Sequence, residues 1–137
     1  MPVQSINEIR KKFSEIFGAD ALFGCLFGSA LEARFNDESD IDIAVYFCEG
    51  VDASQISLLR EKLSDALDRD VDCIDLRSAD PIITMQVIQN GQLAFSQEAD
   101  LYHQFVARKI SEYIDFKKSR ELVEKNLVGK RIIGVKE

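Results

Sequence analysis

Hydrophobic and polar residues alternate along this chain with two different periods, which predict helices interleaved with strands. Apolar residues recur at helical spacing in four segments, and the first three begin at Ser5, Asp52 and Asp80, which can cap a helix. These segments predict helices over 5–17, 52–67, 80–90 and 98–125. Continuous or alternating apolar runs predict strands over 21–27, 40–47, 71–76 and 92–95. A short helix over 29–34 and a short strand or docking tail over 132–135 complete the pattern.

The predicted strand over 40–47 carries two acidic residues on the same face. Asp40 and Asp42 are two positions apart, so their side chains would lie about 6–7 Å from each other, close enough to share metal ions. The preceding strand ends at Gly28-Ser29, and a glycine lets backbone N–H groups approach a phosphate closely. Because Mg²⁺ binds carboxylate and phosphate oxygens, the pattern predicts a site for a nucleotide and a divalent metal.

A third carboxylate often supports a site of this kind, and the predicted strand over 71–76 offers two candidates. Asp72 and Asp75 must point to opposite faces of that strand, so only one of them can join the first two acids. The apolar residues of the strand lie on both faces, and the periodicity therefore leaves the choice open.

Alternating helices and strands in 137 residues predict one domain over 1–137, of the α/β (α+β) class, with a small mixed sheet flanked by helices and a long C-terminal helix. No apolar run is long enough to span a membrane, and the N-terminus lacks the pattern of a secretory signal. The spacing of Cys25, Cys48 and Cys73 fits no zinc site and favours buried, reduced thiols in a cytoplasmic protein. The net charge of −7 argues against direct nucleic-acid binding.

The combined motif resembles the nucleotidyltransferase superfamily of DNA polymerase beta. It consists of Gly28-Ser29, ten further residues, Asp40-Ile41-Asp42, and a later strand that reads Val71-Asp72-Cys73-Ile74-Asp75-Leu76. The short chain is similar to the minimal nucleotidyltransferases (the MNT family), which are commonly the antitoxin partners of HEPN-domain ribonuclease toxins. The resemblance covers about residues 20–95 well and the remainder loosely, and it implies a polymerase-beta-like fold.

The resemblance also implies a role for each residue of the motif. Gly28 and Ser29 match the phosphate-binding pair, and Asp40 and Asp42 match the metal-binding acids. The third acid of the family follows the first valine of its strand, which corresponds to Asp72 here. In the family this acid supports the metal and activates the attacking hydroxyl.

Arg34 occupies the place where relatives often carry an arginine that steadies phosphate charge, although they often follow it with glycine and this chain has Phe35. The implied reaction transfers AMP from ATP onto a tyrosine hydroxyl of a cognate HEPN toxin and releases pyrophosphate. Mg²⁺ is the expected cofactor, with Mn²⁺ as a substitute. The toxin is the expected partner, in a hetero-oligomer.

Two other functions compete with this interpretation. The aromatic residues of the predicted C-terminal helix, among them Tyr102, Phe105, Tyr113 and Phe116, are consistent with a non-catalytic antitoxin that masks its partner. The motif would also suit transfer to a small molecule, as in the aminoglycoside nucleotidyltransferases. Those relatives usually carry an additional helical domain, for which a chain of this length has no room.

Overall fold

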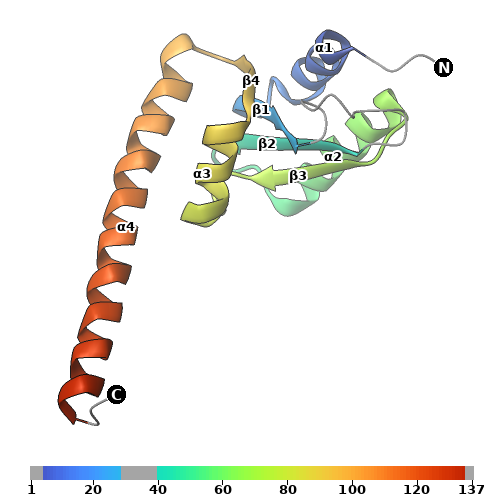
Figure 1. Cartoon of the computed structure of the whole chain (residues 1–137). Helices are drawn as coiled ribbons and strands as arrows, with labels where there is room; N and C mark the ends of the chain where they lie inside the picture. The colour runs from blue at the N-terminus through green and yellow to red at the C-terminus, as the bar shows by residue number, and fades with distance from the viewer. Residues whose placement is uncertain (1–4, 29–39, 135–137) are drawn as a thin grey trace.

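The computed structural model describes residues 5–28 and 40–134, and side chains as far as residue 121. Its elements follow the alternation expected from the sequence (Figure 1). In chain order they are α1 (Ile6–Phe17), β1 (Ala21–Phe27), β2 (Ile41–Phe47), α2 (Ala53–Leu67), β3 (Val71–Asp75), α3 (Pro81–Asn90), β4 (Gln92–Ser96) and α4 (Ala99–Gly134).

The described strands form one mixed sheet in the order β3-β2-β1-β4. The central strand β1 runs antiparallel to both of its neighbours, β2 and β4, whereas β2 and β3 are parallel. The parallel pair is joined by α2, as a parallel connection requires a crossover. The sheet confirms the predicted fold class.

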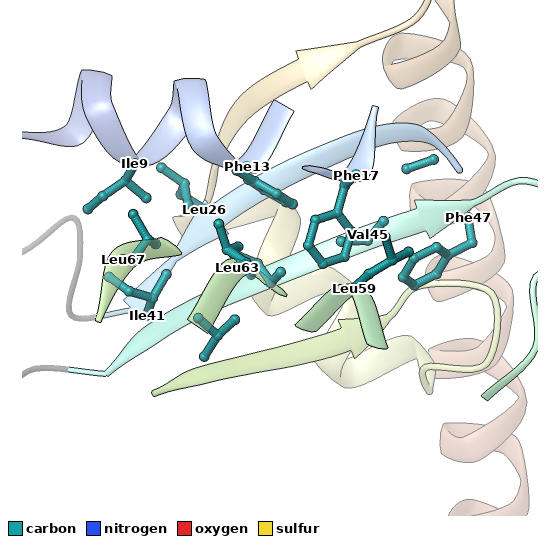
Figure 2. Close-up of a cluster of buried hydrophobic side chains, with 13 residues drawn as sticks. Ile9, Phe13, Phe17, Leu26, Ile41, Val45, Phe47, Leu59, Leu63 and Leu67 are labelled. Atoms are coloured by element: carbon teal, nitrogen blue, oxygen red, sulfur yellow. The ribbon is translucent and has the colours of Figure 1, made fainter. Parts of the chain in front are cut away.

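One face of the sheet is covered by α1 and α2, whose apolar stripes bury against it (Figure 2). Alternate residues of β2 supply its centre, as the sequence pattern predicted, since Ile41, Ile43 and Val45 are fully buried. Phe13 of α1 packs edge-on against Phe95 of β4 with ring centroids 5.0 Å apart. These contacts form the larger of the two apolar clusters and hold α1 across the sheet.

The opposite face is covered by α3 and by the beginning of α4. Phe23 of β1 and Phe105 of α4 are both buried, and their ring centroids lie 5.0 Å apart. Val87 of α3 belongs to the same cluster. This smaller core therefore joins two helices to the face of the sheet that also carries the even-numbered residues of β2.

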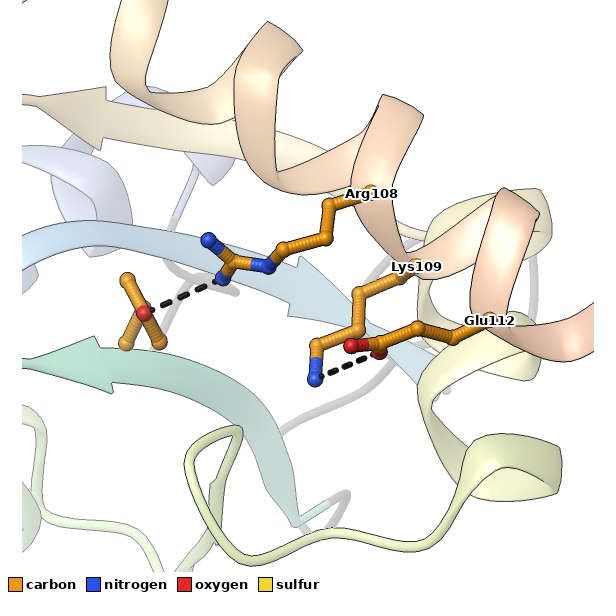
Figure 3. Close-up of polar contacts among 4 residues, drawn as sticks. Arg108, Lys109 and Glu112 are labelled. Atoms are coloured by element: carbon orange, nitrogen blue, oxygen red, sulfur yellow. Dashed lines mark hydrogen bonds and ion pairs between the residues drawn. The ribbon is translucent and has the colours of Figure 1, made fainter.

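One polar contact ties α4 to the sheet, and a second lies within the helix (Figure 3). Arg108 donates to the hydroxyl of Tyr46 on β2 at 3.2 Å, and Lys109 pairs with Glu112 one turn further on at 3.0 Å. Beyond these turns α4 projects past the sheet (Figure 1). It is thus a helix anchored at one end.

The C-terminal end of the described chain is helical where the sequence predicted a strand. The short strand predicted over 132–135 is wrong as far as residue 134, because α4 continues as one helix of 36 residues to Gly134, and the alternative of a docking tail stays a prediction. A helix satisfies its own backbone hydrogen bonds, whereas an added strand must find a sheet edge. The short helix predicted over 29–34 lies outside the described residues.

The other expectations concern burial and the membrane. Cys25 is buried, whereas Cys48 and Cys73 are only partly buried, so the prediction of three buried thiols is wrong for two of them. None of the helices within the described residues has the length and apolar character needed to cross a membrane.

The anchoring of α4 leads to a test of stability. Phe105→Ala should lower the free energy of unfolding by about 3–5 kcal/mol, because it opens a cavity between α4 and β1. Phe116→Ala changes the same residue type on the same helix at a side chain that is 39% exposed, and it should cost less than about 1 kcal/mol. Urea unfolding of both variants measures the difference. Equal losses would contradict the docking of α4 through Phe105.

Candidate nucleotide and metal site

The register between β1 and β2 places the turn after β1 beside an acidic residue. Phe27, the last residue of β1, pairs with Asp42 of β2. Gly28 follows directly and has a φ of 72°, in the left-handed region that favours glycine. The turn and the acid, which are separated in the sequence, are thus neighbours at one end of the sheet.

Gly28 lies in contact with the carboxylate of Asp42. A Cβ added to this glycine would overlap Oδ2 of Asp42 and would lie 3.0 Å from its Cγ. No larger residue fits without displacing the carboxylate, and the positive φ disfavours a side chain independently. The chain therefore brings bare backbone directly against a carboxylate, which places the N–H groups of the turn close to the groups that would bind a phosphate and its counter-ion.

The parallel register between β2 and β3 sets Asp42 directly opposite Asp72. The preceding pair, Ile41 and Val71, is buried in the core beneath α1 and α2. Because side chains alternate along a strand, both aspartates point to the other face of the sheet, where α3 lies. Asp72 is exposed there and Asp42 is partly buried.

Asp75 has a different position. It pairs with Val45, which belongs to the core under α1 and α2, so its strand position faces away from Asp42. Its Oδ1 accepts a hydrogen bond from the backbone N–H of Arg77 at 3.0 Å, and its Oδ2 accepts one from the hydroxyl of Ser78 at 3.3 Å. Asp75 thus caps the turn after β3. The register, which periodicity could not supply, brings Asp72 rather than Asp75 to the face of Asp42.

The remaining residues of the motif lie just outside the strands or outside the described residues. Asp40 is exposed and immediately precedes β2, which starts with a hydrogen bond from the N–H of Ile41 to the carbonyl of Asp70 at 2.9 Å. Ser29 and Arg34 lie outside the described residues. Within 5–28 and 40–121, no three acidic, cysteine or histidine side chains converge on a common point as a metal site. Two carboxylates opposed across strands and a third nearby nevertheless give the all-oxygen donor set that hard divalent cations prefer.

A pocket of about 490 Å³ opens beside Gly28 on the same face of the sheet. Its lining combines apolar side chains with two amide side chains of α3; besides Gly28 the lining residues are Phe27, Ile74, Ile83, Val87, Gln86 and Asn90. Sequence reasoning missed this pocket. A signal was present in the sequence: Gln86 and Asn90 are two amides one helical turn apart, in a helix predicted to end at Asn90-Gly91.

The thiols of Cys25 and Cys73 are poorly suited to nucleophilic chemistry. Burial raises the pKa of Cys25 to about 12, and burial together with the Asp75 carboxylate raises the pKa of Cys73 to about 12. Both thiols therefore stay protonated at neutral pH and are poor nucleophiles. His103 is exposed on α4. The arrangement around Gly28 is suited to binding phosphate and metal rather than to covalent catalysis.

Comparison with known sequences points to the same chemistry. The sequence model of the family described as polymerase beta, nucleotidyltransferase matches residues 4–100. The protein adenylyltransferase MntA of Shewanella oneidensis is 38% identical over 99 residues, which make up 72% of this chain and 70% of that protein.

Solved structures resemble the fold over most of its length. A toxin–antitoxin crystal structure with AMP-PNP superposes with a TM-score of 0.72 at 29% identity, covering 87% of this chain and 98% of the other. A complex of tri-AMPylated Shewanella oneidensis HEPN toxin with MNT antitoxin gives a TM-score of 0.69 at 27% identity, with coverage of 90% and 99%.

The contact between Gly28 and Asp42 can be tested with two glycine substitutions. Gly28→Ala and Gly50→Ala both place a side chain at positive φ, and each should cost about 1–2 kcal/mol of stability. Only Gly28→Ala also displaces a carboxylate, because nothing lies within 4 Å of a Cβ at Gly50. Gly28→Ala should therefore weaken ATP binding at least about tenfold, measured by calorimetry with Mg²⁺, while Gly50→Ala leaves it unchanged. Unaltered affinity in both variants would remove Gly28 from the site.

Proposed function

We propose that this chain, which belongs to the polymerase beta family of nucleotidyltransferases, is an antitoxin that transfers AMP from ATP onto a tyrosine hydroxyl of a cognate HEPN ribonuclease toxin. The observation that carries the proposal is the strand register, which sets Gly28 against Asp42 and Asp42 opposite Asp72. The named activity of the Shewanella relative and its toxin complexes support the choice of substrate and partner.

Nucleotidyltransferases of this family use ATP and a divalent metal ion, and we propose Mg²⁺ for this chain. Asp40 and Asp42 would hold the metal, and Asp72 would complete its carboxylate ligands. When bound, the ion supplies positive charge to the phosphates and lowers the pKa of the attacking hydroxyl. The fit rests on the all-oxygen donor set and on the close approach of the bare Gly28 backbone to the carboxylate of Asp42.

The residues of the chain then bind and orient the nucleotide, and one of them accepts a proton. The tyrosine oxygen attacks the α-phosphorus of ATP, the bond from that phosphorus to its bridging oxygen breaks, and pyrophosphate leaves. Asp72, exposed at the edge of the site, would accept the hydroxyl proton. The backbone at Gly28 and Ser29 would hold the phosphates, and Arg34 would steady their charge. Catalysis of this type depends on positioning and electrostatics.

Exposed apolar side chains on α3 and α4 support a protein partner. Ile82 of α3 and Ile114 and Phe116 of α4 are between 39% and 46% exposed, although each is large and apolar. A groove of about 280 Å³ between the two helices includes Ile82 and Phe116 in its lining. Such a surface is consistent with docking of the toxin. It equally favours the second candidate function, in which the chain neutralises the toxin by binding alone.

We place the reaction in the cytoplasm. The described cysteines are unpaired thiols, as is usual for proteins of a reducing compartment.

The catalytic proposal predicts the effect of removing single carboxylates. Incubation with purified toxin, Mg²⁺ and α-labelled ATP should label the toxin, and Asp42→Asn should lower the rate at least about a hundredfold. Asp75→Asn is the matched control, because that acid caps a turn on the other face of the sheet, and its rate should change less than about threefold. Labelling that survives Asp40→Asn combined with Asp42→Asn would place the chemistry elsewhere. If that double variant labels nothing yet still neutralises the toxin, the masking function is correct.

Metal removal gives a second prediction. Excess EDTA should abolish labelling, and Mg²⁺ should restore it, with Mn²⁺ as the comparison. Asp72→Asn removes a charged ligand, so it should raise the Mg²⁺ concentration needed for half-maximal labelling by about tenfold. Titration of labelling rate against metal measures this shift. A normal metal requirement in Asp72→Asn would exclude that residue as a ligand.

A further inference from the structure

We propose that the pocket beside Gly28 binds the base of the nucleotide, and that Gln86 and Asn90 of α3 select adenine. This inference rests on the proposed nucleotidyl transfer and adds the group that would give it specificity. The pocket volume of about 490 Å³ lies within the range of small-ligand sites.

The end of α3 is held firmly against the end of β1. A Cβ added to Gly91 would lie 2.6 Å from the carbonyl oxygen of Val87 and 3.1 Å from that of Leu26. Gln92, the first residue of β4, pairs with Leu26. Asn90 is therefore fixed close to Gly28, two residues beyond Leu26. The proposed phosphate turn and the last turn of α3 form adjoining walls of one pocket.

The distance along β3 between the acid and the pocket fits the length of a nucleotide. Ile74, which lines the pocket, follows Asp72 by two residues on the same face of β3. A strand rises about 3.3 Å per residue, so the wall lies about 7 Å along the strand from the acid. A sugar ring with its links spans a similar length. A nucleotide whose phosphates lie at Gly28 and Asp42 would thus reach this pocket with its base.

The lining of the pocket matches a base better than a sugar or a phosphate. Phe27, Ile83 and Val87 offer apolar surface to the faces of an aromatic ring. Gln86 and Asn90 are one helical turn apart, so both side chains lie on the same side of α3 and reach the pocket. Each amide offers both hydrogen-bond donors and an acceptor to the edge of the base.

This amide chemistry discriminates between purines. Adenine presents a donor at N6 next to an acceptor at N7, which an amide can pair with through both of its groups. Guanine presents two acceptors at the same edge, O6 and N7, and the amide oxygen would then face an acceptor. A pocket in which glutamine and asparagine side chains read the N7 edge therefore favours ATP over GTP.

The test is a set of leucine substitutions on α3. Gln86→Leu combined with Asn90→Leu should lower the ratio of kcat/KM for ATP to that for GTP by roughly fivefold to a hundredfold in the labelling reaction. The loss should appear in KM for ATP, with kcat changed less than about threefold, because the reacting groups are untouched. Gln89→Leu is the matched control, since this neighbouring exposed glutamine does not line the pocket. It should keep the ratio of the unaltered protein.

Nucleotide binding without toxin separates the two proposals. Calorimetry with Mg²⁺ should show tighter binding of ATP than of GTP, and the double leucine variant should lose that difference. If the unaltered protein labels the toxin but the variant keeps its full preference for ATP, the base pocket is wrong and the proposed function stands. If labelling fails while the preference in binding still depends on Gln86 and Asn90, the pocket stands and the proposed function is wrong. Equal binding of ATP and GTP by the unaltered protein, or no binding of either, would overturn the pocket.

Discussion

The contact between the bare backbone of Gly28 and the carboxylate of Asp42 is the constraint on which the candidate site depends. It exists because β1 ends one residue earlier, at Phe27, opposite Asp42 in an antiparallel pair. A slip of one residue in that pairing would turn every side chain of β2 to the other face and would bury the acid among the apolar residues under α1 and α2. The buried row Ile41, Ile43 and Val45 prevents the slip, since exposing it would cost several kcal/mol.

The two faces of the sheet therefore have different roles. The apolar side chains on the face under α1 and α2 fix the register of the strands. On the face under α3, that register sets the positions of the acids of the candidate site. On that second face the pairing of β2 with β3 adds Asp72, and the tight junction between α3 and β4 at Gly91 holds the end of α3 against β1. The apolar core and the candidate site are thus two consequences of one alternation of side chains along β2.

Much of this arrangement can be predicted from the sequence. The parts that cannot be predicted have one physical cause in common. Helix ends such as those at Ser5 and Asp80 depend on local capping, and the alternation of β2 depends on neighbours in the chain. The choice between Asp72 and Asp75 depends on how β3 aligns with β2, which no local pattern encodes. The pocket likewise forms only when α3 packs on the sheet. The error over 132–134 arose because a short apolar run fits a helix as well as a strand, and here it continues α4.

The single-ended attachment of α4 has an evolutionary consequence. A helix of 36 residues is about 54 Å long, and its anchoring contacts, Phe105 and Arg108, belong to its first three turns. The family sequence model matches only as far as residue 100, where α4 has just begun, whereas the solved toxin–antitoxin structures cover 87–90% of the chain. Mutations in the outer turns can accumulate without shifting the strands that carry the acids. Recognition of a partner and transfer chemistry can thus diverge at separate rates within one lineage, because different parts of the chain would encode them.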